Sequence, residues 1–292
     1  MQISASEVTI AVIGASGRSG SVLCHSLLSE GYKVIAVVRN RKNLSPELDR
    51  NCSAVREAEL TDPDRLSEAL KDANIVVNTA HARYLPAILA ATSVPVVALG
   101  STRKFTRWPD AHGNGVLAGE RALREDGRSS LLLHPTMIYG AQGENNVQRL
   151  AALLKKLPIV PLPDGGRFLV QPIEQGDVTR SVIAAIPLIV SGAIKELETL
   201  VIAGPEAVTY RQFVSMIAQF SQSRKLRIIS VPDWCIRIAA YVLRKLPGVP
   251  RIEDAEIRRL TENKDFDITP MKEKLGVTPI SLQEGLSRVF RK

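Results

Sequence analysis

The sequence predicts an α/β protein with a doubly wound parallel sheet and a smaller, mostly helical C-terminal domain. Short apolar runs rich in Val, Ile and Leu alternate with segments of helical period, and the first run leads into a glycine-rich turn that opens a helix. Strands that are apolar on both faces and separated by helices are typical of a parallel sheet covered on both sides.

The apolar runs and the helical segments place each element. The expected strands are Val8–Ile13, Lys33–Val38, Ile75–Thr79, Val94–Leu99 and Ser130–Leu133. The expected helices between them are Gly17–Glu30, Asp64–Lys71, Leu85–Thr92 and Gly115–Glu125.

The pattern changes after Gly140 to a helix, a Pro-rich crossing with a Gly165-Gly166 turn, and a helix that Asp177 caps. A strand is expected in "ELETLVIAGP", and helices in "TYRQFVSMIAQF", "VPDWCIRIAAYVLRKLP" and "RIEDAEIRRLTENK". We therefore expect two interleaved domains. Residues 1–155 and 177–204 form the sheet domain, and residues 156–176 and 205–292 form a cap that holds a substrate.

Composition argues against several protein classes. The longest uncharged stretch, Ser181–Ile194, has 14 residues and contains Pro187, whereas a membrane span needs about 18 or more. The N-terminus lacks the basic and apolar regions of a secretory signal. Three cysteines at unrelated spacings predict neither a disulfide framework nor a metal site. We expect a cytoplasmic protein without a membrane span.

The net charge of +8 comes from 38 Lys and Arg against 30 Asp and Glu, and aromatic residues make up only 4%. A nucleic-acid-binding protein usually concentrates basic residues on one face and interleaves aromatic residues for stacking. The basic residues here are scattered along the chain. An anionic small-molecule ligand explains the charge, and no nucleic-acid partner is expected.

The stretch "IGASGRSG" has the spacing of a dinucleotide-binding turn. Gly14, Gly17 and Gly20 follow an apolar strand and open a helix, and a second strand follows. The glycines permit a sharp turn, close approach of a pyrophosphate and close helix packing, while the positive helix end lies under the phosphates.

The end of the second strand indicates the nucleotide. An NAD-binding protein usually has Asp or Glu there, whereas this strand ends in Arg39. A guanidinium group pairs with the 2′-phosphate of NADP, and Arg18 in the turn can assist. The sequence therefore predicts NADP (NADPH), with NAD less favoured; a solvated charge at the strand end is the alternative for Arg39.

The chain resembles the short-chain dehydrogenase/reductase superfamily, in particular its extended and atypical members related to nucleotide-sugar epimerases and dehydratases. The resemblance rests on "GASGRSG", "AELTDPDRL", "VVNTAHARY", "ALGST" and "HPTMIYG", and it extends to the dinucleotide-binding accessory subunit of respiratory complex I. It implies a Rossmann-type domain that binds NAD(P). The cofactor-binding residues that it implies are Gly14, Ser16, Gly17, Arg18, Ser19, Gly20, Arg39, Glu59, Leu60, Thr79, Ala80 and Pro135.

The resemblance fails at the catalytic pair. Members of the superfamily place a Tyr and, four residues later, a Lys beside the nicotinamide. Here His112 stands at the Tyr position and Val116 at the Lys position, and no Tyr occurs between Tyr84 and Tyr139. The lost pair leaves three alternatives open.

The first alternative is an oxidoreductase or epimerase-like enzyme with a substituted acid/base, acting on a nucleotide-sugar or similar hydroxylated substrate. His112 or His81 would transfer the proton, Ser101 and Thr102 would orient the substrate, and Tyr139 would line the pocket. A loop position without a catalytic role is the other interpretation of His112. His134 is expected to face the packed interior, where it replaces the family's usual Arg.

The second alternative is a non-catalytic NADPH-binding protein that senses the cofactor or stabilises an assembly, which implies a protein partner or a homo-oligomer. The apolar residues of "WCIRIAAYVLRKLP" extend almost around the expected helix, which fits a partner surface or, more simply, packing within the second domain. The third alternative is a relict fold that binds nucleic acid.

Overall fold

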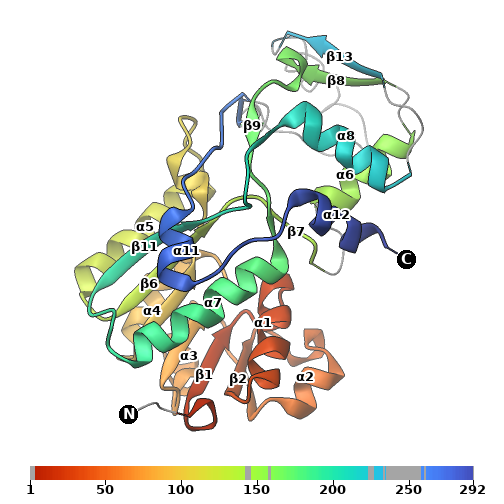
Figure 1. Cartoon of the computed structure of the whole chain (residues 1–292). Coiled ribbons are helices and arrows are strands. Elements are labelled where there is room, and N and C mark those ends of the chain that lie inside the picture. Colours follow the sequence, from red (N-terminus) through yellow and green to blue (C-terminus); the bar gives the residue numbers. More distant parts are fainter. Residues whose placement is uncertain are drawn as a thin grey trace.

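The centre of the molecule is a parallel sheet of seven strands (Figure 1). The structure, a computed structural model, describes residues 4–141, 146–156, 159–222, 227–232, 234, 258–259 and 261–291. In spatial order the strands are β11 (Leu197–Ile202), β6 (Ser130–Pro135), β5 (Val96–Leu99), β4 (Ile75–Asn78), β1 (Thr9–Ile13), β2 (Lys33–Val38) and β3 (Ala54–Glu57). The chain builds outward from β1 in both directions, so the order reverses between β1 and β4. Parallel sheets bind ligands at such a switch point. The predicted doubly wound fold is confirmed.

Helices cover both faces of the sheet and enclose two apolar cores. The helices of the first core are α1 (Arg18–Ser29), α2 (Pro46–Asn51), α7 (Gln175–Val190) and α11 (Thr269–Leu275). Those of the second core are α3 (Pro63–Leu70), α4 (Leu85–Ala91) and α5 (Ala111–Asp126). In β1, Ile10 and Val12 belong to the first core, and Ala11 and Ile13 to the second. Successive side chains point to opposite faces of a strand, which is why β1 is apolar throughout.

A third apolar core lies apart from the sheet, in the upper part of Figure 1. Its elements are α6 (Asn146–Lys156), β8 (Ile159–Pro163), α8 (Tyr210–Phe220) and α12 (Leu282–Phe290). The short strand pairs are β7 (Ile138–Tyr139) with β10 (Ile173–Glu174), β9 (Leu169–Val170) with β12 (Val208–Thr209), and β8 with β13 (Arg227–Val231). The 3-10 helices of the chain are η1 (Ala5–Glu7), η2 (Arg41–Asn43), η3 (Ala82–Tyr84), η4 (Thr102–Phe105) and η5 (Asp164–Gly166).

The division into residues 1–155 with 177–204 and residues 156–176 with 205–292 stays a prediction, but two helices pack differently from it. Helix α6, expected with the sheet, packs in the third core through Val147 and Leu154. Helix α11, expected in the cap, packs in the first core through Met271 and Leu275, because the chain returns to the sheet beside β11 and α7.

The cap of α7 differs from the prediction. The carboxylate of Glu174, not of Asp177, accepts the capping hydrogen bond from the N–H of Gly176 (2.6 Å). Asp177 lies inside the first turn, where it is buried. It forms an ion pair with Arg180 and accepts a hydrogen bond from the N–H of Ile280 (2.9 Å). Asp177 therefore joins α7 to the segment before α12.

Part of the expected C-terminal structure cannot be compared. The helix in "VPDWCIRIAAYVLRKLP" and most of the one in "RIEDAEIRRLTENK" lie outside the described residues. Within the described part of the chain, the helices are too short or too polar to cross a membrane.

Candidate functional site

The turn between β1 and α1 has a geometry that suits a phosphate group. Gly14 has a φ of +81°, a conformation that side chains rarely adopt. A Cβ at Gly20 would overlap the carbonyl oxygen of Gly14, so α1 packs directly beneath the turn. Gly17 caps α1 without a side-chain hydrogen bond. The first N–H groups of the helix are thus left to bind an anion.

A cavity of about 350 Å³ opens beside this turn, and we call it the glycine-loop cavity. The predicted cofactor-binding residues that line it are Gly14, Ser16, Gly17, Arg39, Glu59, Leu60, Thr79 and Ala80. The other lining residues are Ile13, Val37, Val38, Ala58, Arg83 and Tyr84. The carboxyl ends of β1, β2 and β4 and the segment after β3 therefore meet around one space, as a dinucleotide requires.

The other predicted cofactor-binding residues lie outside the lining of this cavity. Arg18 is the exposed first residue of α1, and Gly20 lies beneath the turn. The hydroxyl of Ser19 donates to Oε1 of Gln175 on α7 (2.9 Å). The carbonyl of Pro135 accepts a hydrogen bond from Oγ1 of Thr102 (3.3 Å). A contact between these residues and a cofactor stays a prediction.

Arg39 lines the cavity at the exposed end of β2. The neighbouring Arg41 points elsewhere, because its guanidinium binds Asp49 (Nε–Oδ1, 2.6 Å) and its backbone N–H donates to Glu57 (2.5 Å). Within the described residues Arg39 has no ion pair. Its guanidinium is therefore the strand-end cation best placed for an anionic group in the cavity.

Arg83 and Tyr84 form a wall of the cavity that the sequence did not predict. Both residues belong to η3, the short helix after β4. The guanidinium of Arg83 lies 4.8 Å from the centre of the Tyr84 ring, and its Nη2 donates to the Tyr84 hydroxyl (2.9 Å). The only sequence signal for this wall is the Arg-Tyr pair that ends "NTAHARY".

Helix α5 carries the residues at the expected catalytic positions. The side chain of Asp110 caps the helix by accepting a hydrogen bond from the N–H of Gly113 (2.7 Å). His112 lies exposed in the first turn. Val116, one turn later, is 1% exposed. The position where the resemblance expects a Lys thus holds a buried apolar side chain.

The imidazole rings of His112 and His81 meet edge to face, with their centroids 4.3 Å apart. Nδ1 of His81 accepts a hydrogen bond from the N–H of Arg83 (3.0 Å). Partial loss of hydration lowers the pKa of both rings; His112 itself also lowers the pKa of His81, and Arg103 lowers that of His112. Both imidazoles are therefore neutral at pH 7, and a neutral imidazole can accept a proton.

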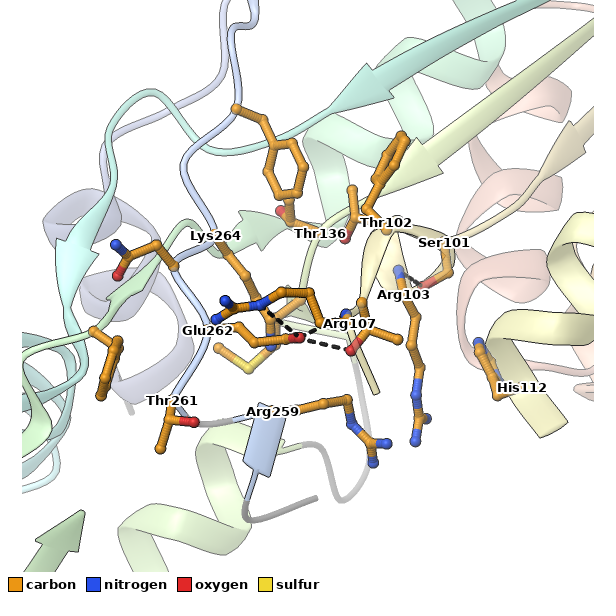
Figure 2. A pocket seen from close by; sticks show the side chains of 16 residues that line it. Ser101, Thr102, Arg103, Arg107, His112, Thr136, Arg259, Thr261, Glu262 and Lys264 are labelled. Atoms are coloured by element: carbon orange, nitrogen blue, oxygen red, sulfur yellow. Dashed lines mark hydrogen bonds and ion pairs between the residues drawn. The ribbon is translucent and has the colours of Figure 1, made fainter. Parts of the chain in front are cut away.

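A larger cavity of about 700 Å³ has His112 in its lining, and we call it the arginine cavity. Its lining residues, which Figure 2 shows, are Ser101, Thr102, Arg103, Phe105, Thr106, Arg107, His112, Thr136, Met137, Phe168, Arg259, Thr261, Glu262, Asn263, Lys264 and Phe266. Of the residues expected to be catalytic, Ser101, Thr102 and His112 come together here. The sequence did not predict the cationic residues of this lining, because no motif marks them. They are Arg103, Arg107, Arg259 and Lys264.

Two carboxylates join the walls of the arginine cavity. Oδ2 of Asp110 binds Nη2 of Arg103 (2.5 Å) and Nη1 of Arg259 (2.6 Å). Glu262 accepts hydrogen bonds from Oγ1 of Thr106 (2.8 Å) and from the N–H of Arg107 (2.7 Å). Arg259 and Glu262 are thereby fixed against the segment between β5 and α5.

A buried cluster lies behind Ser101 and Thr102. Lys104 of η4 forms an ion pair with Glu120 of α5, and its Nζ lies 3.2 Å from Nε2 of His134. His134 is 1% exposed, as expected. Burial and then the charge of Lys104 lower the pKa of His134 to about 4, so this imidazole is neutral at pH 7. Lys104 is the cation nearest to the carboxylate of Glu120.

Tyr139 is not in either cavity lining, although we expected it to line the pocket. Its side chain is 1% exposed and belongs to the third core. The ring packs so closely on Gly285 of α12 that a Cβ there would overlap it. Burial, and then the charges of Glu174 and Asp177, raise the pKa of the phenol. Tyr139 is therefore placed as a packing residue.

Among the residues that the structure describes, no group of three or more His, Cys, Asp or Glu side chains is arranged to hold a metal ion.

Comparison with protein families identifies the first part of the chain. Residues 14–107 match the model of a family described as NAD(P)H-binding. This segment contains the glycine turn and every residue that lines the glycine-loop cavity except Ile13. Residues 14–107 are therefore similar to an NAD(P)H-binding domain.

Uncharacterized proteins of Mycobacterium tuberculosis and Mycobacterium bovis are 25% identical to this chain over 276 residues, which cover 92% of the chain. The chain spans only 28% of the length of these curated relatives.

Solved structures share the fold over nearly the whole chain. An NADPH-dependent quinone oxidoreductase from Escherichia coli, complexed with NADPH, has a TM-score of 0.75 at 18% identity and covers 97% of this chain and 100% of its own. A UDP-glucuronic acid 4-epimerase from Bacillus cereus, with UDP-glucuronic acid and NAD, has a TM-score of 0.73 at 18% identity, with coverages of 97% and 98%. A UDP-glucose 4-epimerase from Thermotoga maritima, with UDP-glucose, has a TM-score of 0.72 at 18% identity and covers 97% of each chain. The chain therefore shares its overall fold with these proteins.

Proposed function

We propose that this chain is an NADPH-dependent oxidoreductase or epimerase-like enzyme with a histidine in place of the usual Tyr–Lys pair. Its cofactor would bind in the glycine-loop cavity, and a hydroxylated or carbonyl substrate, such as a nucleotide-sugar, would bind in the arginine cavity. The contact between His81 and His112 carries the proposal, because His112 lines the arginine cavity and His81 lies between Ala80 and Arg83, which line the glycine-loop cavity.

The residues of the glycine-loop cavity fit a dinucleotide. The turn at Gly14 and the uncapped start of α1 suit the pyrophosphate. Arg39 suits a 2′-phosphate and so favours NADPH over NADH. When bound, NADPH supplies a hydride to a carbonyl carbon.

In the arginine cavity, the hydroxyls of Ser101 and Thr102 would orient the substrate oxygen. The ring of His112 would give that oxygen a proton when a carbonyl is reduced, and would take it back when an alcohol is oxidised. Each reduction leaves His112 neutral until solvent returns the proton. Because burial and Arg103 lower the pKa of His112, oxidation should run well at pH 7, whereas reduction should speed up as the pH falls.

The test is a turnover assay at 340 nm with NADPH or NADP⁺ and a panel of quinones, ketones and UDP-sugars. His112→Ala should remove turnover by about a hundredfold or more while NADPH binding is kept. His25→Ala is the matched control, since His25 lies exposed beside Glu47 (3.7 Å). Turnover that survives His112→Ala would contradict the assignment of His112.

The second candidate function is a non-catalytic NADPH-binding protein. The buried Val116 favours it, because a conventional active site has an ammonium group at this place. This function predicts tight NADPH binding, no turnover with any member of the panel, and a protein partner or homo-oligomer whose stability depends on NADPH.

A further inference from the structure

Lys264 projects into the arginine cavity without an acidic partner. Its side chain is half-buried, lines the cavity and points toward its centre in Figure 2. The backbone N–H of Lys264 donates to the carbonyl of Leu169 (2.9 Å), which fixes the main chain at this point. Within the described residues, its ammonium group has no hydrogen bond or ion pair.

The two carboxylates that join the walls of the arginine cavity are already engaged. Glu262 accepts hydrogen bonds from Thr106 and Arg107, and Asp110 binds two guanidinium groups and the start of α5. The cations that line the cavity are Arg103, Arg107, Arg259 and Lys264. Among the described lining residues, the only carboxylate is that of Glu262. Within the same part of the chain, the buried Nε of Arg103 has no hydrogen-bond partner.

This arrangement is costly in the absence of an anion. A half-buried ammonium group loses water, and a nearby cation repels it. Burial, and then Arg259 and Arg103, lower the pKa of Lys264, while the charge of Glu262 opposes the decrease. An oxyanion at Nζ would compensate for the lost hydration and for the repulsion.

The aromatic residues of the cavity add a second requirement. The side chain of Phe105 is 51% exposed, and its ring lies 5.8 Å from that of Phe266. Phe168 also lines this cavity. Aromatic rings bury large apolar areas and stack on planar groups. The cavity therefore combines a cationic part with an aromatic part.

We propose that Lys264, together with Arg103, binds an oxyanion of the substrate, and that a planar group of the same molecule packs against Phe105 and Phe266. This inference rests on the proposed function, since it takes the arginine cavity as the substrate site. The oxyanion is a phosphoryl or a carboxylate group, and the probes distinguish the two.

The test is a calorimetric titration of the full chain with UDP, inorganic pyrophosphate and benzoate, each in saturating NADPH so that the glycine-loop cavity is filled. Lys264→Met should weaken binding of the responsive probe by roughly tenfold or more. Lys264→Arg should restore most of it. Lys33→Met is the control, because Lys33 is exposed at the start of β2. Arg39→Ala reports any probe that binds in the glycine-loop cavity instead.

A response of UDP and pyrophosphate assigns a phosphoryl group, and a response of benzoate alone assigns a carboxylate. Equal affinity of the wild type and Lys264→Met for every probe, or no binding of any probe to the wild type, overturns the inference. NADPH titration alone tests the proposed function. If the protein does not bind NADPH but still binds a probe in a way that depends on Lys264, only the proposed function is rejected.

The pH dependence of the wild type provides a second measurement if Lys264→Met fails to fold. Probe binding should weaken as the pH rises toward 10, because the lowered pKa makes Lys264 neutral below its ordinary 10.5. The other charged groups that line the cavity are Arg103, Arg107, Arg259 and Glu262, and the imidazole of His112 lines it as well. Binding to Lys264→Arg should stay constant. A wild-type affinity that does not change between pH 7 and 10 overturns the inference.

Discussion

Arg259 and Asp110, which are 149 positions apart, form a nearly buried ion pair at the start of α5 (Nη1–Oδ2, 2.6 Å). Asp110 also caps α5 and binds Arg103. One carboxylate thus fixes the helix that carries His112, the segment after β5 and the segment that bears Lys264. The geometry of the arginine cavity depends on this residue.

We expect Asp110→Ala to lower the free energy of unfolding by about 2–4 kcal/mol. The lost cap accounts for about 1 kcal/mol, and the loss of the ion pairs with Arg103 and Arg259 accounts for the rest. Asp62→Ala is the matched control, since Asp62 caps α3 (Arg65 N–H to Oδ1, 3.1 Å) but has only an exposed ion pair. Urea denaturation of both variants measures the difference, and equal losses would mean that the ion pairs contribute nothing.

The same carboxylate predicts how stability responds to acid. Burial alone would raise the pKa of Asp110, but the N–H of Gly113 and the charges of Arg103 and Arg259 together lower it below 3.8. A lowered folded-state pKa gives stability that is present above the unfolded value and lost as the pH falls through the folded value. The difference in the free energy of unfolding between the wild type and Asp110→Asn should therefore decrease below about pH 3.8. Acid denaturation of both proteins measures it.

The fold was predictable wherever a strand is apolar on both faces. Strands β1, β2, β4, β5 and β6 were predicted because burial on both sides requires continuous apolar runs. Strand β3 was missed, because it lies at the edge of the sheet and its sequence "AVRE" is only partly buried. Helix α2 was missed because it has only six residues, too few to show a helical period.

The glycine-loop cavity was largely predictable, because its residues follow strands in a known order. The arginine cavity was not. Arg103, Asp110 and Arg259 come together through tertiary packing over a long sequence separation, and no local pattern records that contact. The role of Lys104 was hidden for the same reason, since its partners lie on α5 and β6.

Arg39→Ala should weaken NADPH binding by about tenfold or more while it leaves NADH binding nearly unchanged, since only NADPH has the 2′-phosphate. Calorimetric titration measures both affinities. Arg41→Ala is the control, because its guanidinium binds Asp49 rather than lining the cavity. Equal weakening of NADPH and NADH by Arg39→Ala would show that the guanidinium does not contact the 2′-phosphate.

Gly20→Ala should abolish measurable NADPH binding and reduce stability. Alanine normally stabilises a helix relative to glycine by about 1 kcal/mol, but a Cβ here would overlap the Gly14 carbonyl and also reach within 2.8 Å of Thr79 Oγ1. The turn would have to move away from α1. Ser21→Ala, at the next position of the helix, provides the control. A Gly20→Ala protein that binds NADPH like the wild type would contradict the close packing.

The Lys104–Glu120 pair predicts a coupled effect on stability. Lys104→Met leaves the mostly buried Glu120 without its nearest cation, so we expect a loss of about 2–4 kcal/mol in the free energy of unfolding. Glu120→Gln in the same chain should recover part of that loss, because no carboxylate then remains uncompensated. A double-mutant cycle in urea measures the coupling. Purely additive effects would contradict the pairing.

His134 provides an independent readout of the same cluster. The charge of Lys104 lowers its pKa, while Glu120 raises it, so the Lys104→Met variant should shift the pKa of His134 upward from about 4. If the shifted pKa exceeds the ordinary 6.5, protonation of His134 adds to the free energy of unfolding. This contribution is complete below pH 6.5, the unfolded value, and is lost as the pH rises through the shifted pKa. Proton NMR of the histidine ring measures the pKa directly, and Arg124→Met, which removes an exposed cation 3.5 Å from Glu120, is the control. An unchanged His134 titration in Lys104→Met would show that the ammonium group does not reach the imidazole.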